Sequence, residues 1–482
     1  MRNTRIVAAV VVAAAVPVLL SIVLQSAAAA ATAGGRPANQ HAAGVSAQHI
    51  TLVRGAADRT ARFTTAKAGE NLVDLTASAP GANWGQVGAE SAVISMSVDG
   101  RYQSDIVIPF ADPIAREFAL GSLAAGKHTL RFHFASDRTP PLVRKAVLGS
   151  IKVTTFTPQD PDYRFLRFAP ILYGRNLADF GGTYASSFTD APLVAWHESA
   201  PASTPGHTVL TYSVIWSNED GGTDTPALMA RWGRTTDIEW VYTVEVDQNG
   251  NRVPGSDTFQ GASHVTQHFA GTYEGDHALI ETCTSNNNIC DQVDPMRFAL
   301  SYKENLQPSD QPREHIMDTN LWTYRVTATE MIRENKLEAA GDPSTPQVSD
   351  ERNYLFLTVT KDTIPSGDSS VGASVEITLK GSSTIYRSDH LGTGGDPSWS
   401  LARDIPASTT VELPPGTTAD DIASVTLVRV PTGADTGATI HATDVTRGFF
   451  LDSSYQPEPG ILDWHGSVNL TQQSPTATIW TA

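Results

Sequence analysis

Short segments in which apolar and polar residues alternate, separated by turn residues, recur from His49 to the end of the chain. Alternation with a period of two is typical of a half-buried β-strand, whereas an amphipathic helix repeats its apolar residues every three to four positions. Roughly seven or eight such segments lie between His49 and Thr157, and Asp99-Gly100 is a hairpin turn signal between two of them. The pattern predicts an all-β protein of two or three β-sandwich units in tandem.

The chain is long enough for several domains, because one hydrophobic core stops growing at about 250 to 300 residues and this chain has 482. Thr157–Arg164 contains two prolines and two aspartates, which is typical of a crossing between domains. Leu321–Glu330 alternates like a strand, and Ala328–Ala340 is the one short helix that we expect, with Met331 on its apolar face. We expect a signal peptide at 1–33, a flexible lead at 34–48 and an accessory sandwich at 49–157. A central β-rich domain at 158–346 is expected to carry the functional site. The C-terminal sandwich at 347–482 either folds alone or merges with the central domain.

The N-terminus has the layout of a secretory signal peptide. Met1–Arg5 carries two arginines, Ile6–Leu24 is apolar except for Ser21, and Ala27–Ala33 offers small residues for cleavage. The apolar run is also long enough for an uncleaved anchor, but its alanine content and Pro17 favour cleavage. We therefore predict a secreted, extracellular protein in which no later segment spans a membrane.

Charge and cysteine content narrow the partners further. The 34 basic and 51 acidic residues give a net charge of −17, which argues against nucleic acid because phosphate backbones need a basic face. Cys283 and Cys290 are the two cysteines, and in an exported chain the spacing predicts a disulfide that closes an Asn-rich loop. The acidic composition fits a soluble extracellular protein, a cation ligand or a neutral substrate. We expect a carbohydrate polymer as partner, and the sequence predicts no oligomeric state.

The stretch RWGRTTDIEWVYTVEVDQNG, Arg231 to Gly250, carries an unusual row of acidic residues. If 236–247 is one strand, Asp237, Glu239, Glu245 and Asp247 share a face, because successive strand side chains point to opposite sides. The face is either solvated or lines a cleft. We expect Glu245 and Asp247 to belong to a solvated hairpin end, and Asp237 and Glu239 to act as a cation site or as an acid and base pair.

Several residues are therefore candidates for function. Aromatic rings pack against the apolar faces of sugars, and arginines neutralise carboxylates of acidic sugars. The catalytic candidates are Asp237, Glu239, His268 and Arg231, the substrate-binding candidates are Trp216, Tyr212, Arg234 and Trp84, and the ligands for a divalent cation such as calcium are Asp237, Glu239 and Asp220.

Two resemblances to known families support a glycan-related role. GRTTDIE, Gly233–Glu239, falls in the frame of the heptapeptide of secreted necrosis-inducing proteins, which is glycine, histidine, arginine, histidine, aspartate, tryptophan and glutamate. In that family the heptapeptide lines an acidic cavity that holds a divalent cation and serves binding of sphingolipid glycans, and the resemblance implies this role for Asp237 and Glu239. Arg234 and Thr236 replace both histidines, so the resemblance to the metal site is incomplete. Segments that resemble the related vacuolar-protein-sorting-like β-sandwich proteins are Phe168–Arg175, Ala191–Glu198, Tyr212–Gly222 and Gly275–Glu281.

The N-terminal unit resembles the accessory β-sandwiches of secreted carbohydrate-acting proteins through Gly81–Tyr102 and Leu120–Phe134. Such a module implies an exposed aromatic platform for sugar, for which Trp84 and Tyr102 are candidates; the alternative is that Trp84 is a core residue.

Two functions remain open from the sequence. The first is a secreted glycoside hydrolase or polysaccharide lyase with an acidic, cation-assisted site, in which Glu198, Glu219, Asp220 or Glu281 is an alternative carboxyl partner and His268 or Tyr212 is the base of a lyase. The second is a noncatalytic glycan-binding protein of the cell envelope with structural calcium. No nucleophile elbow, P-loop, HExxH or dinucleotide motif is present, which removes the hydrolases, kinases, zinc proteases and dehydrogenases that carry them.

Overall fold

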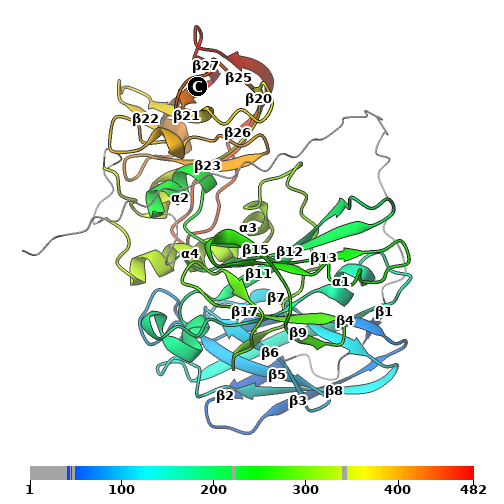
Figure 1. Ribbon diagram of the computed structural model, residues 1–482. Helices are drawn as coiled ribbons and strands as arrows, with labels where there is room; N and C mark the ends of the chain where they lie inside the picture. Colours follow the sequence, from blue (N-terminus) through cyan, green and yellow to red (C-terminus); the bar gives the residue numbers. More distant parts are fainter. Residues whose placement is uncertain (1–40, 44, 46–48, 220–223, 339–342, 344) are drawn as a thin grey trace, which may run out of the picture. The chain divides into compact units, whose positions relative to one another are not determined.

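The computed structural model describes residues 41–43, 45, 49–219, 224–338, 343 and 345–482, which belong to one compact unit (Figure 1). The predicted signal peptide lies outside the described residues, as does most of the flexible lead. Within the described residues, six sheets form three sandwiches in tandem, and nearly all of their strand pairs are antiparallel. The predicted all-β class is confirmed.

The first sandwich shows why the alternating pattern forms strands. In Arg59–Thr65 (β3), Ala61, Phe63 and Thr65 are buried, and the residues between them are exposed. One face therefore packs on the core and the other meets water. The first sheet has the order β1-β9-β4-β7, with β2 also on β9; its strands are β1 (His41–Ala43), β2 (His49–Val53), β4 (Gly69–Ser78), β7 (Ile114–Leu123) and β9 (Lys145–Phe156). The second sheet has the order β3-β8-β5-β6, with β5 (Ala92–Val98), β6 (Arg101–Ile108) and β8 (Gly126–Phe134).

The central sandwich combines an antiparallel sheet with a smaller mixed one. The larger sheet runs β11-β12-β13-β14-β15, with β11 (Pro192–Pro201), β12 (Thr208–Trp216), β13 (Ile238–Val246), β14 (Thr258–Gly261) and β15 (Val265–His268). The smaller runs β16-β17-β10-β19 with β18 on β17, and contains β10 (Ile171–Tyr173), β16 (Tyr273–Glu274), β17 (His277–Thr282), β18 (Ile289–Cys290) and β19 (Arg297–Phe298). The helices are α1 (Tyr163–Phe168), α2 (Thr225–Trp232), α3 (His315–Thr319) and α4 (Trp322–Arg333).

The last sandwich has two four-stranded sheets, β23-β20-β25-β26 and β22-β21-β24-β27. Their strands are β20 (Tyr354–Ile364), β21 (Val371–Leu379), β22 (Ile385–Arg387), β23 (Ala407–Glu412), β24 (Ile422–Pro431), β25 (Thr439–Phe449), β26 (Leu462–Leu470) and β27 (Thr476–Thr481). A core of its own fills this sandwich, whereas one continuous hydrophobic core runs through the first and central sandwiches.

The segment Leu321–Glu330, predicted as a strand, is instead the body of α4. Tyr324, Ala328 and Met331 are buried at helical spacing, so the segment has one apolar stripe that packs on the core. The hydroxyl of Thr329 donates to the carbonyl of Arg325 at 2.6 Å, a bond within the helix that reduces the conflict between threonine and helical structure. The expected helix at Ala328–Ala340 is therefore misplaced: α4 ends at Arg333, and Ala340 lies outside the described residues.

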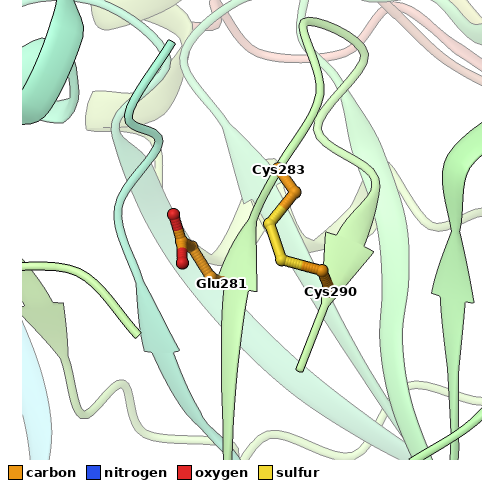
Figure 2. A group of neighbouring side chains, drawn as sticks. All are labelled: Glu281, Cys283 and Cys290. Atoms are coloured by element: carbon orange, nitrogen blue, oxygen red, sulfur yellow. A yellow bond between two sulfur atoms is a disulfide. The ribbon is translucent and has the colours of Figure 1, made fainter. Parts of the chain in front are cut away.

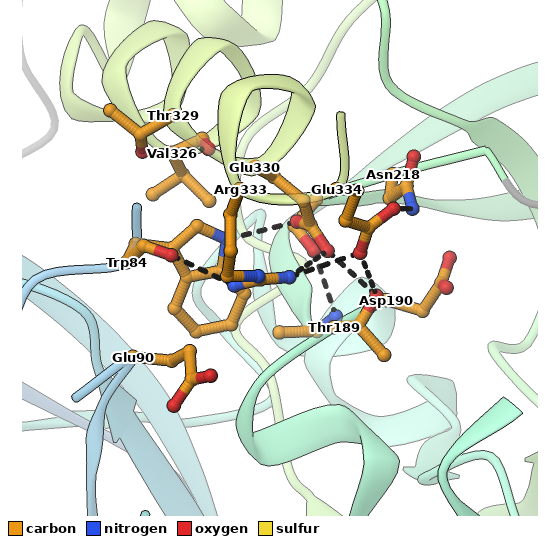
Figure 3. A network of polar contacts seen from close by, with 12 residues as sticks. Trp84, Glu90, Thr189, Asp190, Asn218, Val326, Thr329, Glu330, Arg333 and Glu334 are labelled. Carbon is orange, nitrogen blue, oxygen red and sulfur yellow. Dashed lines mark hydrogen bonds and ion pairs between the residues drawn. The ribbon is translucent and has the colours of Figure 1, made fainter. Parts of the chain in front are cut away.

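Trp84 is a core residue that joins the first sandwich to α4 (Figure 3). Its indole Nε1 donates to Glu330, and its carbonyl accepts a 2.8 Å hydrogen bond from Arg333. Thr189, in the chain just before β11, donates to the other oxygen of Glu330 at 2.7 Å. The expectation that Trp84 is an exposed sugar platform is wrong, because its ring is fully buried in this network.

The last sandwich fixes the C-terminal end of α2. Thr409 and Thr410 of β23 donate to the carbonyls of Ala230 and Met229 at 2.6 and 2.9 Å, which satisfies acceptors that a helix end leaves free. Gly233 then ends the helix with φ +62°, and a Cβ there would lie 3.0 Å from the Ser408 side chain. The chain therefore turns toward β13 at a position where a side chain does not fit.

Candidate functional site

A β-bulge in β13 decides which way its acidic residues point. Tyr212 of β12 pairs with Tyr242, but the next residue, Ser213, pairs with Trp240, so Val241 is an extra residue in the ladder. A single extra residue reverses the alternation of side chains on either side of it. The strand therefore has two different alternations, one before Val241 and one after it.

Glu239 consequently lies on the same sheet face as Tyr242, contrary to the expected parity. Glu239 pairs with Val214, which shares a face with Tyr212 because the two are two residues apart. Asp237, two residues before Glu239, follows it to this inner face. Glu245, after the bulge, stays on the opposite face, where it is half-buried and pairs with His207 at 2.6 Å.

The hairpin that follows β13 is confirmed. The Asp247 carboxylate accepts bonds of 2.8 Å from the backbone N–H groups of Asn249 and Asn251. Asp247 therefore stabilises a turn, and the four predicted carboxylates separate into two that line a cavity and two that do not.

The cavity has a volume of about 480 Å³ and contains all four residues of the predicted functional half, Arg231, Arg234, Asp237 and Glu239. Residues from four other segments complete the wall. Glu219, a predicted alternative carboxyl partner, and His264, which the sequence suggests as a general acid or base together with His268 and His277, are both in the lining. The lining residues that no sequence feature pointed to are Trp232, Asn286 and Arg313.

Asp237 and Glu239 form a carboxyl pair that resists full ionisation. Asp237 is 2% exposed, and burial together with the charges of Glu239 and Glu219 raises its pKa well above the usual range. Burial also raises the pKa of Glu239. The charge of His264, whose Nδ1 lies 3.4 Å from Oε1 of Glu239, and a hydrogen bond from Gln260 oppose this rise. The pair therefore retains a proton at a pH where free carboxyl groups have lost theirs.

One oxygen of this pair has no protein partner. Among the described residues, Oδ2 of Asp237 is buried and accepts no hydrogen bond. A buried acceptor without a donor is unfavourable by about 1 to 3 kcal/mol, so the neutral, protonated form of Asp237 is further favoured.

Three arginines, Arg231, Arg234 and Arg313, form a basic wall of the cavity. The guanidinium of Arg234 is held by Glu314 at 3.0 Å and by the carbonyl of Thr236. Arg231 and Arg313 have no carboxylate within 4.0 Å among the described residues, although both line the cavity. The cavity therefore presents two guanidinium groups without an ionic partner.

The ring of Trp232 packs against arginine side chains, so it is not a free surface for stacking with a ligand. The guanidinium carbon of Arg403 lies 3.8 Å from the ring centroid, and those of Arg234 and Arg231 lie 5.7 and 5.8 Å from it. Burial, and then the neighbouring arginines, lower the pKa of Arg403 to about 10. The local excess of positive charge favours an anionic ligand.

The predicted disulfide between Cys283 and Cys290 is present (Figure 2). Cys283 and Cys290 close a loop in which Asn286 lines the cavity and lies 3.2 Å from Nε2 of His264. Asn287, fully buried beneath it, donates to Asp190 at 3.0 Å. The disulfide and the hydrogen bond from Asn287 therefore hold the loop in place around Asn286, the residue that reaches the cavity.

The described residues do not contain a ready cation site at the cavity. The group of three His, Cys, Asp or Glu side chains with ligand atoms within 4.8 Å of one another is Glu281, Cys283 and Cys290, and its two cysteines form the disulfide (Figure 2). Asp237 and Glu239 thus lack a third such ligand among the described residues, and the predicted ligand Asp220 lies outside them.

Three other predicted residues are not part of the cavity. Trp216 and Tyr212 are fully buried on the inner face of β12, so their predicted contact with substrate is wrong. His268 is exposed at the end of β15 and does not line the cavity; His264, four residues earlier, does. The short 3-10 turn Ala262–His264 between β14 and β15 directs His264 toward Glu239, and no sequence signal distinguishes the two histidines.

Within the described part of the chain, no helix combines the length and the apolar character needed to cross a bilayer.

Comparisons with known proteins give only weak matches. No family model and no curated protein matches the chain. A solved structure described as "NLPPya in complex with mannosamine" aligns with 35% of this chain and 92% of that chain at 13% identity and a TM-score of 0.21. The tandem CBM51 modules of the family 98 glycoside hydrolase Sp3GH98 from Streptococcus pneumoniae align over 78% and 77% of the two chains at 11% identity and a TM-score of 0.15. A ruminal GH26 endo-beta-1,4-mannanase aligns over 27% of this chain and 29% of that chain at 14% identity and a TM-score of 0.14. At such scores the alignments assign neither a fold nor a function.

Proposed function

We propose that this is an extracellular protein that binds an acidic polysaccharide in the cavity beside β13 and hydrolyses a glycosidic bond in it. The observation that carries the proposal is that a carboxyl pair, Asp237 and Glu239, shares one cavity of about 480 Å³ with two guanidiniums that have no ionic partner among the described residues. This volume lies in the range of small-ligand sites. Export is inferred from the N-terminal sequence.

The basic wall binds the acidic sugar. Arg231 and Arg313 hold a uronate carboxylate through charge-assisted hydrogen bonds, which are roughly twice as strong as neutral ones. Arg234 serves in support, because Glu314 and the Thr236 carbonyl already engage its guanidinium. The Asn286 amide completes the wall and contacts sugar hydroxyls.

The carboxyl pair carries out the chemistry. Glycoside hydrolysis needs one protonated and one ionised carboxyl group. Asp237, which is deeper and repelled by two carboxylates, keeps the shared proton and donates it to the leaving glycosidic oxygen. Glu239, supported by Gln260 and His264, accepts a proton from the water that attacks the anomeric carbon. No step requires a metal ion.

A second candidate is a noncatalytic glycan-binding protein that uses a divalent cation such as calcium. The unpartnered Oδ2 of Asp237 beside Glu239 favours it. In that case calcium raises the melting temperature of the wild-type protein, a chelator lowers it, and Asp237→Asn abolishes the response.

The test is incubation of the purified protein with acidic polysaccharides such as pectate, alginate and hyaluronan, and with neutral cellulose and mannan. We expect new reducing ends from an acidic polymer alone. Ultraviolet absorbance from an unsaturated uronate would show a lyase instead. Calcium-dependent binding without any product would support the second candidate over the first.

A further inference from the structure

A second cavity, of about 510 Å³, lies where the first sandwich meets the central one. The backbone N–H of Ala119 in β7 donates to the carbonyl of Ala299 at 2.8 Å, which joins the two sandwiches at the cavity wall. Side chains from β4, β6, β7, α1 and the β16–β17 turn surround the space. It shares no lining residue with the cavity beside β13.

The charged groups of this cavity are matched within the wall. Arg167 pairs with Asp276 at 2.6 Å. Glu274 accepts bonds from Arg101 and from Arg297, the latter at 2.7 and 2.9 Å. A charged ligand would have to break one of these pairs, so the lining favours a neutral ligand.

Two buried polar side chains of the cavity, His277 and Glu70, are held in fixed positions by hydrogen bonds. His277, 8% exposed, donates from Nδ1 to the carbonyl of Ala169 at 2.8 Å and places Nε2 at 3.5 Å from Glu70, which is 4% exposed. Although burial opposes it, the hydrogen bond to Glu70 raises the pKa of His277. These two side chains are therefore oriented before any ligand arrives.

One buried acceptor in the wall lacks a donor. Gln103 is 2% exposed, and its Nε2 donates to the carbonyl of Ala119 at 3.0 Å, which fixes the orientation of the amide. Its Oε1 has no hydrogen-bond partner among the described residues. Gln103 lines the cavity, so this unsatisfied oxygen lies close to where a ligand hydroxyl would be, and its isolation is otherwise unfavourable.

The remaining wall is apolar or aromatic. Tyr163 of α1 is half-buried, and Ala119, Pro170 and Ile171 extend the apolar surface. Apolar surface beside fixed acceptors suits a pyranose ring, which has apolar faces and a rim of hydroxyls.

We propose that this junction cavity is a second binding site, for a neutral saccharide unit, separate from the cavity beside β13. Gln103 and Glu70 accept hydrogen bonds from its hydroxyls, and Tyr163 contacts its ring. Because the site is built from both sandwiches, a bound sugar stabilises their contact. The proposal does not depend on the hydrolase activity.

The experiment measures binding of methyl glycosides of glucose, galactose, mannose and N-acetylglucosamine by calorimetry, with galacturonate as the anionic probe. Gln103→Leu removes the free acceptor, and Ser122→Trp fills the cavity from an exposed position without altering the core. Arg59→Gln, at an exposed position of β3 outside both cavities, is the control. Each variant is checked by its melting temperature.

We expect saturable binding of at least one neutral glycoside, weakened about tenfold or more by Gln103→Leu and by Ser122→Trp, and unchanged by Arg59→Gln. Absence of binding by all four neutral probes would overturn the proposal. So would binding that survives Ser122→Trp in a folded protein, or a preference for galacturonate that Ser122→Trp abolishes.

Discussion

The indole Nε1 of Trp84 donates a hydrogen bond of 2.9 Å to Oε2 of Glu330, a residue 246 positions later in the chain (Figure 3). The bond connects a loop of the first sandwich to α4. Arg333 stacks on the same indole at 5.4 Å and pairs with Glu330 at 3.0 Å. Because the bond joins distant segments through buried polar atoms, this network is a test of how the sandwiches depend on one another.

Replacing Trp84 with phenylalanine removes the donor and leaves Oε2 of Glu330 buried without it. We expect Trp84→Phe to lower the free energy of unfolding by about 1 to 3 kcal/mol beyond the loss of ring volume. Trp322→Phe is the matched control, because Nε1 of Trp322 has no hydrogen-bond partner among the described residues. Chemical denaturation measures both, and equal losses would show that the Trp84 hydrogen bond contributes nothing.

Glu330 makes stability depend on pH. Burial, partly offset by Arg333 and reinforced by Glu334, raises its pKa to about 7 from an ordinary 4.5. An acid whose pKa is raised by folding binds more protons in the folded state than in the unfolded state. The contribution of Glu330 to the free energy of unfolding is therefore complete below pH 4.5 and is lost as the pH rises through 7. The rise in the pKa of Glu330 corresponds to a change of roughly 3 kcal/mol at most in the free energy of unfolding.

Glu330→Gln should therefore flatten the decline of stability between about pH 4.5 and pH 7. Denaturation midpoints of both proteins at several pH values measure the effect. A variant whose stability falls with pH as steeply as that of the wild type would show that Glu330 does not titrate in this range.

The carboxyl pair is tested by Asp237→Asn and Glu239→Gln. Each should lower the cleavage rate of the acidic polysaccharide by about 100-fold or more, because each removes one half of the acid and base pair. Glu245→Gln, on the same strand but after the bulge, is the control and should retain full activity. Loss of activity in Glu245→Gln, or its retention in Asp237→Asn, would contradict the proposed roles.

The basic wall is tested by Arg231→Gln and Arg313→Gln. A lost hydrogen bond between charged groups corresponds to about 1.5 to 3 kcal/mol, so each variant should bind the acidic polymer roughly 10- to 100-fold more weakly. Arg59→Gln, at an exposed position in β3, is the control because it changes the net charge by the same amount away from the cavity. This variant should bind the acidic polymer as the wild type does. Similar weakening by all three would indicate attraction by overall charge alone.

Much of the fold is local and could be predicted from the sequence. Alternating segments and turn residues predict strands wherever one sheet face is buried and the other solvated, as in Arg59–Thr65. The Cys283–Cys290 disulfide and the turn around Asp247 also depend on residues close in sequence. The strand predicted at Leu321–Glu330 is wrong because its threonines favour strands in isolation, whereas burial of one helical stripe decides the outcome.

The site was only half predictable. Arg231, Arg234, Asp237 and Glu239 are close in sequence and were grouped correctly at one cavity. Arg313, Asn286 and His264 come from distant segments, and only folding brings them to the same wall.

By itself the sequence determined the all-β class, the disulfide and the acidic composition of the strand after Gly233, because these depend on residue type and short-range periodicity. Only the tertiary structure decided which face carries Asp237 and Glu239. The deciding residue is Val241, whose place as an extra residue depends on the register between β12 and β13. Register is a property of two strands together, and alternation within one strand does not contain it.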